Sequence, residues 1–182
     1  MAALVALAFL MTGTLSAEAL KSGPQVGDNL PGPFHPLNVC NVDQPDQNGK
    51  KACFVCQFGV SPVALVFTRE INEPLTELCK KLDACAAKHK DAKACVLLLT
   101  DEEGAERKLK SFAEKHGFKN VNFGVDNPSG PAKYDIAKDA AVTVVLYKGH
   151  KIVANHAFKK GELTVKSIEK IEGDMPKIVA SN

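Results

Sequence analysis

The chain contains one Cys-x-x-Cys motif, formed by Cys53 and Cys56. Two cysteines at this spacing can form an exchangeable dithiol, supply half of a metal site, or serve as structural cysteines. Thiol exchange needs a sulfur whose pKa is lowered by a helix N-terminus or by a nearby cation. Lys50 and Lys51 are close in sequence, but the sequence predicts no helix start after the motif. The three roles therefore stay open at this point.

A structural disulfide is one of these alternatives. A strong turn signal separates two predicted hairpin strands, Leu37–Val42 and Lys51–Phe58. If the turn is centred between Asp46 and Gln47, Cys40 faces Cys53 across the hairpin. The Cα atoms of directly opposed strand residues lie about 4.5–5.5 Å apart, which is within disulfide range. In a regular strand Cys53 and Cys56 point to opposite faces. They can therefore bond to each other only if the segment is a tight turn.

Metal binding through the motif needs further ligands, and no second Cys-x-x-Cys supplies them. His35, Cys40 and His156 could complete a site only by folding onto the hairpin. The metal candidates are therefore Cys53, Cys56 and His156, and no cofactor is expected.

A regular alternation of strands and helices must position these residues. The continuous apolar run Val63–Phe67 predicts a strand buried on both faces. Further strands are predicted at Cys95–Leu99, Val121–Val125, Val142–Tyr147 and Ile152–Phe158, and helices from Pro74 to Cys85, from Thr100 to Gly117, from Pro131 to Ala137 and from Gly161 to Ile171. This order predicts an α/β fold, a central sheet with helices on both faces, preceded by an N-terminal β-hairpin.

Four segments carry a resemblance to a known family: Val26–Pro31 as lead-in, Pro62–Phe67 as central strand, Val142–Val153 as late hairpin, and Gly161–Leu163 opening the last helix. Through them the chain resembles the thioredoxin-like superfamily, especially the redoxin branch that includes peroxiredoxins. The similarity covers about residues 24–171. It implies a thioredoxin-like central sheet, thiol–disulfide redox activity, and protein thiols or disulfides as partners.

The chain departs from that family at its usual active site. The loop after the central strand, Arg69–Pro74, contains no cysteine, and Val142 stands where the family places a cis-proline. Cys53 and Cys56 lie upstream of the central strand, where the family has no redox centre. The lead hypothesis is a thiol–disulfide oxidoreductase whose catalytic cysteines are the displaced Cys53 and Cys56. The alternatives are a non-catalytic binding or scaffold domain with structural disulfides and a metal-handling protein, so enzymatic activity is left open.

Two of the other cysteines, Cys85 and Cys95, are expected in the core. Cys85 continues the apolar stripe of the first long helix, Cys79 lies on another side of the same helix, and Cys95 begins a buried strand. A bridge from Cys79 or Cys85 to Cys95 is left open.

Composition and the first residues restrict location and partners. A net charge of +2, with two tyrosines and no tryptophan, argues against nucleic acid as a partner. The apolar run Ala3–Met11 is shorter than the about 20 residues that span a bilayer, and Ala17–Ala19 fits a signal cleavage site. We therefore expect a signal peptide at 1–19, an extended lead-in at 20–36, one thioredoxin-like domain at 37–173 and a tail at 174–182. This predicts export to the periplasm or the extracellular space, with no stable membrane span after cleavage, and in such a compartment disulfides persist.

Overall fold

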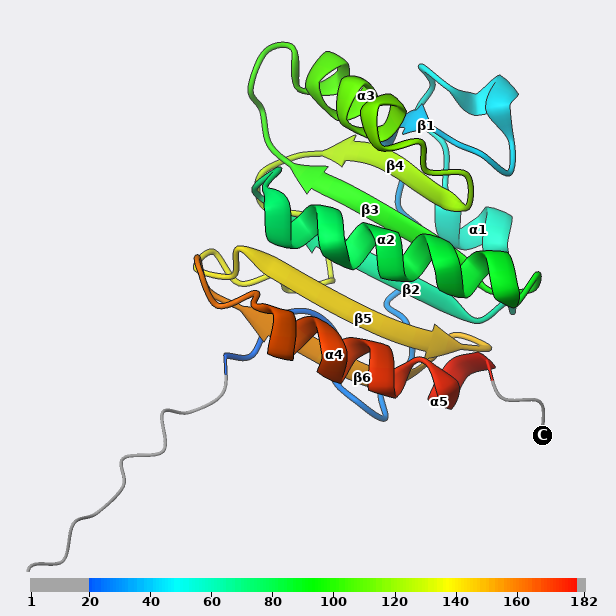
Figure 1. The fold of residues 1–182 in the computed structure, drawn as a ribbon, viewed down its shortest axis with the longest axis vertical. Helices are drawn as coiled ribbons and strands as arrows, with labels where there is room; N and C mark the ends of the chain where they lie inside the picture. The colour runs from blue at the N-terminus through cyan, green and yellow to red at the C-terminus, as the bar shows by residue number, and fades with distance from the viewer. Residues whose placement is uncertain (1–19, 180–182) are drawn as a thin grey trace, which may run out of the picture.

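The computed structural model describes residues 20–179 of the chain, so the predicted signal peptide at 1–19 lies outside the described residues. Its centre is a six-stranded sheet with the order β1-β4-β3-β2-β5-β6 (Figure 1). The strands are β1 Leu37–Cys40, β2 Val63–Thr68, β3 Lys93–Leu99, β4 Val121–Asp126, β5 Val142–Lys148 and β6 Lys151–Phe158. The helices are α1 Phe54–Phe58, α2 Glu73–Lys88, α3 Ala105–His116, α4 Val165–Asp174 and α5 Pro176–Val179, with a 3₁₀ helix at Pro45–Gln47.

The sheet is mixed. Strands β2, β3 and β4 are parallel to one another. Strand β5 is antiparallel to both β2 and β6, and β1 is antiparallel to β4. All six residues of β2 are buried, as its uninterrupted apolar sequence predicts for a strand covered on both faces. The predicted α/β class, with helices on both faces, is confirmed.

Helices α2, α3, α4 and α5 cover the face that is turned toward the viewer in Figure 1. Asn72 is the N-cap of helix α2, and its side chain accepts a hydrogen bond from the backbone N–H of Leu75 at 3.0 Å. The buried stripe of α2 includes Leu75, Leu78, Cys79 and Leu82. These side chains belong to one cluster with the even-numbered apolar residues of β2 and the buried residues of α3 and α4. This layer forms the larger of two hydrophobic clusters.

The opposite face is covered by α1, by the lead-in and by the irregular segment between β4 and β5. Leu30 and Phe34 of the lead-in and Tyr134 of that segment pack there with Phe54 of α1 and Phe67 of β2. The predicted helix at 131–137 is wrong, because this segment consists of turns, bends and residues without regular secondary structure. The Tyr134 hydroxyl donates a hydrogen bond to the carbonyl of Gly32 at 2.7 Å, which joins the segment to the lead-in.

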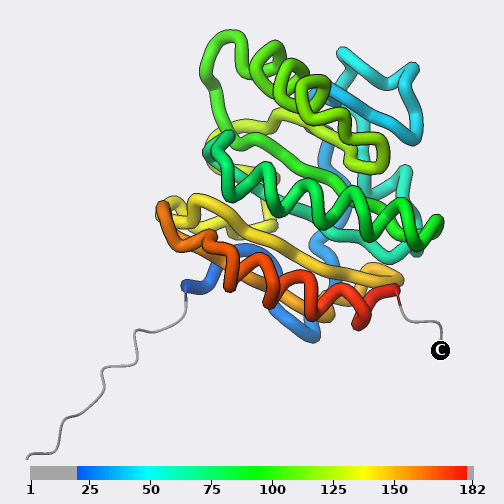
Figure 2. Tube along the Cα trace, in the orientation of Figure 1, coloured from blue at the N-terminus to red at the C-terminus, as the bar shows by residue number. Residues whose placement is uncertain are grey.

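The lead-in runs beside the start of β6, although more than a hundred residues separate them in sequence (Figure 2). The backbone N–H of Gly27 donates to the carbonyl of Ile152 at 3.0 Å, and the N–H of Ile152 donates to the carbonyl of Asp28 at 3.0 Å. Along the same path, the Asn155 side chain donates to the carbonyls of Ser22 and Pro24. The extended lead-in is thus part of the folded domain.

The N-terminal hairpin is present in a shortened form. Leu37 and Lys51 form an isolated antiparallel bridge, and the backbone N–H of Asn38 donates to the carbonyl of Lys50 at 2.9 Å. The strand predicted over Lys51–Phe58 ends there, because residues 54–58 form helix α1 instead.

None of the described helices is both long enough and apolar enough to cross a membrane.

Candidate functional site

Cys53 and Cys56 lie at the start of helix α1 and are joined by a disulfide, with their Cα atoms 5.3 Å apart. Cys53 is the N-cap residue, and its sulfur accepts a hydrogen bond from the backbone N–H of Cys56 at 3.1 Å. The expectation that no helix starts at the motif is therefore wrong. From the sequence, these two cysteines could bond to each other only if the segment is a tight turn. The chain adopts such a turn at the start of α1.

Helix α1 has one buried and one open side. Phe54, Val55 and Phe58 are buried against the sheet, and the rings of Phe54 and Phe58 stack with their centroids 5.7 Å apart. Cys53 is half-buried and packs against the same apolar cluster, whereas Cys56 is exposed. The disulfide therefore spans from the edge of the core to the solvent.

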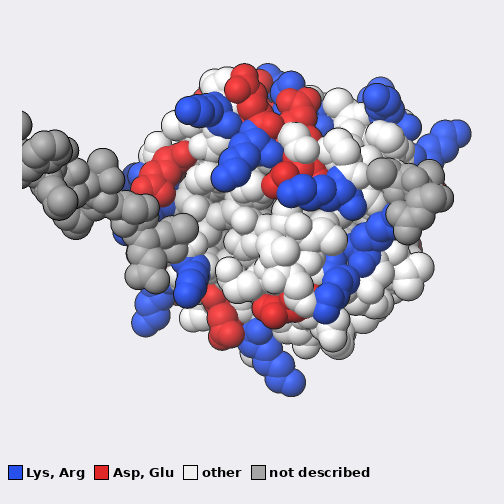
Figure 3. Space-filling view, turned by 90° about the horizontal axis from the view of Figure 1, so that it is seen from below, with Lys and Arg blue, Asp and Glu red and all other residues white. Residues whose placement is uncertain are grey.

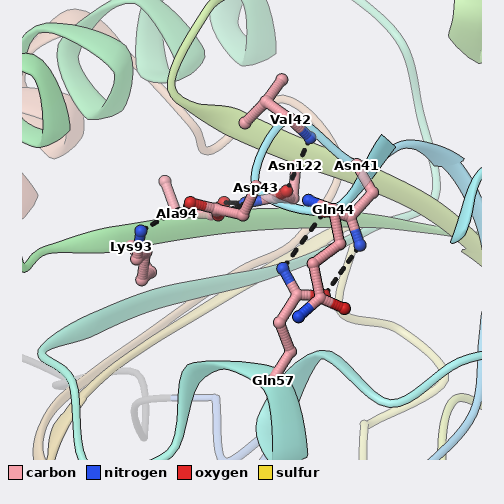
Figure 4. Close-up of polar contacts among 8 residues, drawn as sticks. All are labelled: Asn41, Val42, Asp43, Gln44, Gln57, Lys93, Ala94 and Asn122. Carbon is pink, nitrogen blue, oxygen red and sulfur yellow. Dashed lines mark hydrogen bonds and ion pairs between the residues drawn. The ribbon is translucent and has the colours of Figure 1, made fainter. Parts of the chain in front are cut away.

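Paired amide side chains hold α1 against the end of β1. Asn41 Nδ2 donates to Gln57 Oε1 at 2.8 Å, and Gln57 Nε2 donates back to Asn41 Oδ1 at 3.1 Å (Figure 4). Asn41 is 2% exposed, so both of its polar atoms depend on protein partners. Just before the motif, Asn38 Nδ2 donates to the carbonyl of Ala52 at 3.1 Å. These contacts fix both ends of the Cys-x-x-Cys segment.

A second set of polar contacts fixes the loop that carries Asn41. The buried Asn122 on β4 accepts from the backbone N–H of Val42 at 3.0 Å and donates to Asp43 Oδ2 at 2.8 Å (Figure 4). Asp43 also pairs with Lys93 of β3, with 2.5 Å between Oδ1 and Nζ. Through this set the motif is tied to two central strands. Asn41 and Asn122 carried no sequence signal that marked them, because their partners lie far along the chain.

The proposed Cys40–Cys53 bridge is wrong. Cys40 is a free thiol, and it packs against the cluster on the α2 side of the sheet, whereas Cys53 packs against the cluster on the opposite side. The bulge in the pairing of β1 with β4 lies between Asn38 and Cys40 and changes the facing that a regular hairpin would give.

The remaining cysteines are free thiols. Cys85 and Cys95 pack in or against the core as expected, and Cys79 is buried there as well. Cys79 and Cys95 are fully buried, and burial raises the pKa of both thiols. Cys85 is half-buried, and desolvation raises its pKa as well, against the opposing effect of Lys88. Such thiols are poor nucleophiles because the thiolate is the reactive form. The bridge to Cys95 that the sequence left open does not form.

The loop after β2, where relatives of this fold place their active site, is occupied by an anchor. The Arg69 guanidinium donates to the carbonyls of Ala140 at 3.0 Å, Ala137 at 3.3 Å and Pro128. Its backbone N–H donates to the carbonyl of Ala141 at 2.9 Å. No cis peptide bond occurs within residues 20–179, so the position of Val142 lacks the usual cis-proline. The loop is thus a structural junction.

His156 lies away from the Cys-x-x-Cys motif. It projects from β6 toward α4, where its Nε2 lies 2.9 Å from Asp174 Oδ2. Within the part of the chain that the structure describes, no three His, Cys, Asp or Glu side chains come close enough together to hold a metal ion. The structure therefore does not bring His156 together with Cys53 and Cys56.

The sheet order and the helices on its two faces define a thioredoxin-like fold with a Cys-x-x-Cys disulfide on α1. Three solved structures show the likeness. Peroxidoxin BcpB from Mycobacterium tuberculosis is 14% identical at a TM-score of 0.60, over 86% of this chain and 99% of that one. BsSco, of the Sco family of cytochrome c oxidase assembly proteins, is 16% identical at a TM-score of 0.55, over 87% of this chain and 100% of that one.

The third is a secreted disulfide oxidoreductase of M. tuberculosis homologous to E. coli DsbE, 12% identical at a TM-score of 0.52, over 79% of this chain and 95% of that one. At these identities the likeness concerns the fold. No protein-family model matches the sequence, and no curated protein matches it either.

Proposed function

We propose that this protein is an exported thiol–disulfide oxidoreductase that works through Cys53 and Cys56. The observation that carries the proposal is the disulfide between them, which lies at a helix start with one cysteine in the solvent. Similarity to a secreted disulfide oxidoreductase supports the reaction class. Protein thiols and disulfides are the corresponding substrates.

The reaction is a two-electron exchange. In the reducing direction, one thiolate of the reduced motif attacks a substrate disulfide, a mixed disulfide forms, and the first substrate sulfur leaves as a thiolate that takes a proton from water. The second motif thiolate then attacks the mixed disulfide, closes Cys53–Cys56 and releases the second substrate thiolate. The N–H of Cys56 can stabilise negative charge on the sulfur of Cys53.

Replacing both motif cysteines tests this function. The double variant Cys53→Ser, Cys56→Ser should reduce insulin disulfides no faster than the buffer, because no dithiol is left to resolve a mixed disulfide. Turbidity of insulin with dithiothreitol as electron donor measures the rate. Cys40→Ser is the matched control, since it removes a half-buried free thiol on the other face and should keep the wild-type rate. Wild-type rates in the double variant would exclude the function.

A non-catalytic scaffold is the second candidate, and the anchoring of Arg69 at the usual catalytic loop favours it. The insulin assay separates the oxidoreductase from the scaffold. If the protein is a scaffold, the wild type keeps its disulfide but reduces insulin no faster than the buffer.

Export is tested on the native protein. Signal cleavage after Ala19 should give a mature chain that begins at Leu20. Intact-mass measurement of protein from the source cells checks this. A chain that retains residues 1–19 in the cytosol would contradict export.

A further inference from the structure

The two cysteines of the motif differ in how a second molecule can reach them. Helix α1 directs Phe54, Val55 and Phe58 into the core, which leaves Cys56 on its outward side. Cys56 is exposed, whereas Cys53 is half-buried against the apolar cluster. A thiolate that attacks a disulfide must approach one sulfur in line with the S–S bond, so access selects which sulfur is attacked.

The hydrogen bond at the N-cap distinguishes the two sulfurs in a second way. The sulfur of Cys53 accepts the backbone N–H of Cys56 at 3.1 Å. A hydrogen-bond donor stabilises the thiolate more than the thiol, and a sulfur that leaves as a stabilised thiolate leaves faster. Access therefore favours attack at Cys56, and the hydrogen bond favours departure of Cys53.

We propose that Cys56, the second cysteine of the motif, carries the mixed disulfide with the substrate, and that Cys53 is the resolving cysteine. This assignment rests on the proposed oxidoreductase function.

Each step balances in this assignment. When the oxidised protein accepts electrons, a substrate thiolate attacks the sulfur of Cys56, the Cys53–Cys56 bond breaks, and Cys53 leaves with the electron pair. A second substrate thiolate then attacks the substrate sulfur of the mixed disulfide and releases Cys56 as a thiolate. The protein gains two electrons, the substrate dithiol becomes a disulfide, and the two protons pass through water.

The test uses the two single variants, fully reduced and then exposed to glutathione disulfide as the probe at about pH 10, above the ordinary thiol pKa of about 8.5, so that both thiols are ionised and the rates compare access alone. Cys53→Ser, which leaves Cys56, should form the glutathione adduct at least about tenfold faster than Cys56→Ser, by the access argument above. Mass spectrometry of the quenched protein gives the rate, and peptide mapping locates the adduct. The double variant Cys53→Ser, Cys56→Ser supplies the blank for the other thiols, and circular dichroism verifies that all three variants are folded.

The outcomes separate this assignment from the function on which it rests. An active wild type with a faster adduct on Cys53 overturns the assignment and leaves the oxidoreductase function in place. Equal rates in the two single variants overturn the assignment as well. A wild type without insulin turnover overturns the function, whatever order of reactivity the single variants show.

Discussion

Gln57 links the chemistry of the motif to its support, because it directly follows Cys56 and shares two hydrogen bonds with the buried Asn41. Removing the Gln57 amide leaves polar atoms of Asn41 without those partners in a buried place. Such a loss costs about 1–3 kcal/mol when water cannot replace the partner.

We therefore expect Gln57→Ala to lower the free energy of unfolding by about 1–3 kcal/mol in urea. Gln44→Ala is the control, since Gln44 is exposed and its contact to Asn41 is made by the backbone N–H, at 2.7 Å. It should change stability by less than about 0.5 kcal/mol. Equal effects of the two substitutions would contradict the role of the amide pair.

The buried His156 leads us to expect a pH dependence of stability. Burial lowers the pKa of His156, and this effect outweighs the nearby carboxylate of Asp174, while Lys170 and Lys177 add to the lowering. His156 is therefore neutral in the folded state at pH 7, and its contact with Asp174 is a hydrogen bond between a neutral ring and a carboxylate. Its unfolded pKa is about 6.5.

Because the unfolded chain binds a proton at this site more readily than the folded one, stability should fall as the pH drops from about 7 toward the lowered folded pKa. Urea unfolding at several pH values between 5 and 7.5 should show this fall in the wild type and a smaller fall in His156→Gln. His35→Gln, at an exposed histidine, should keep the wild-type dependence. A steeper fall in His156→Gln would reverse the sign argued here.

At the scale of elements, the packing of α1 against the sheet depends on Gly124 in β4. A Cβ at Gly124 would lie 3.0 Å from the carbonyl oxygen of Leu37, 3.0 Å from Leu97 and 3.1 Å from the ring of Phe54. The Leu37 oxygen belongs to the backbone of β1 and cannot turn aside as a side chain can. The absence of a side chain here thus lets β1 and α1 approach β4.

Gly124→Ala should therefore destabilise the fold by about 1–3 kcal/mol, as overpacking does. Gly173→Ala is the opposite control, because Gly173 lies in α4 with open space around a new Cβ, and alanine in a helix is favoured over glycine by about 0.5–1 kcal/mol. Thermal unfolding of both variants compares the signs. Stabilisation by Gly124→Ala would show that the contact is not tight.

The sequence predicted the elements whose pattern is long and continuous, and it missed α1. Strands β2, β3 and β5 are apolar runs, and α2 has a stripe at helical spacing, so their periods indicate them directly. Helix α1 has five residues, too few for a helical period to show, and its phenylalanines and valine favour strands in isolation. What makes it helical is non-local: the burial of Phe54 over β4 and the amide pair with Asn41.

For the same reason, the sequence named the candidate site residues but did not predict their geometry. The pairing of β1 with β4 and the side of the sheet that each cysteine faces follow from a bulge and from strand order. Neither has a local signature in the residues around Cys40.

At the scale of the whole molecule, the disulfide is a minor contributor to stability. The bond closes a loop of three-residue separation, which contributes about 2 kcal/mol on the chain-entropy model. The two hydrophobic clusters and the six-stranded sheet do not depend on it. The reduced protein should therefore stay folded, as a working dithiol requires.

Urea unfolding with and without a phosphine reductant measures this. We expect a loss of at most about 2 kcal/mol on reduction, and no change in the Cys53→Ser, Cys56→Ser variant. Unfolding of the wild type on reduction would assign the bond a structural role instead.

The surface of the molecule carries no single dominant charge on the face seen from below. Lysine and arginine side chains there alternate with aspartate and glutamate around an uncharged centre (Figure 3). This mixed pattern agrees with the small net charge of +2.

The anchoring of Arg69 limits how this scaffold can be re-engineered. Its guanidinium joins the end of β2 to the carbonyls of Ala137 and Ala140. Introducing a cysteine at position 69 would remove these hydrogen bonds and release the segment before β5, next to the new thiol. Building a thiol centre in this loop therefore requires a new contact that holds the segment before β5, in addition to the new cysteine.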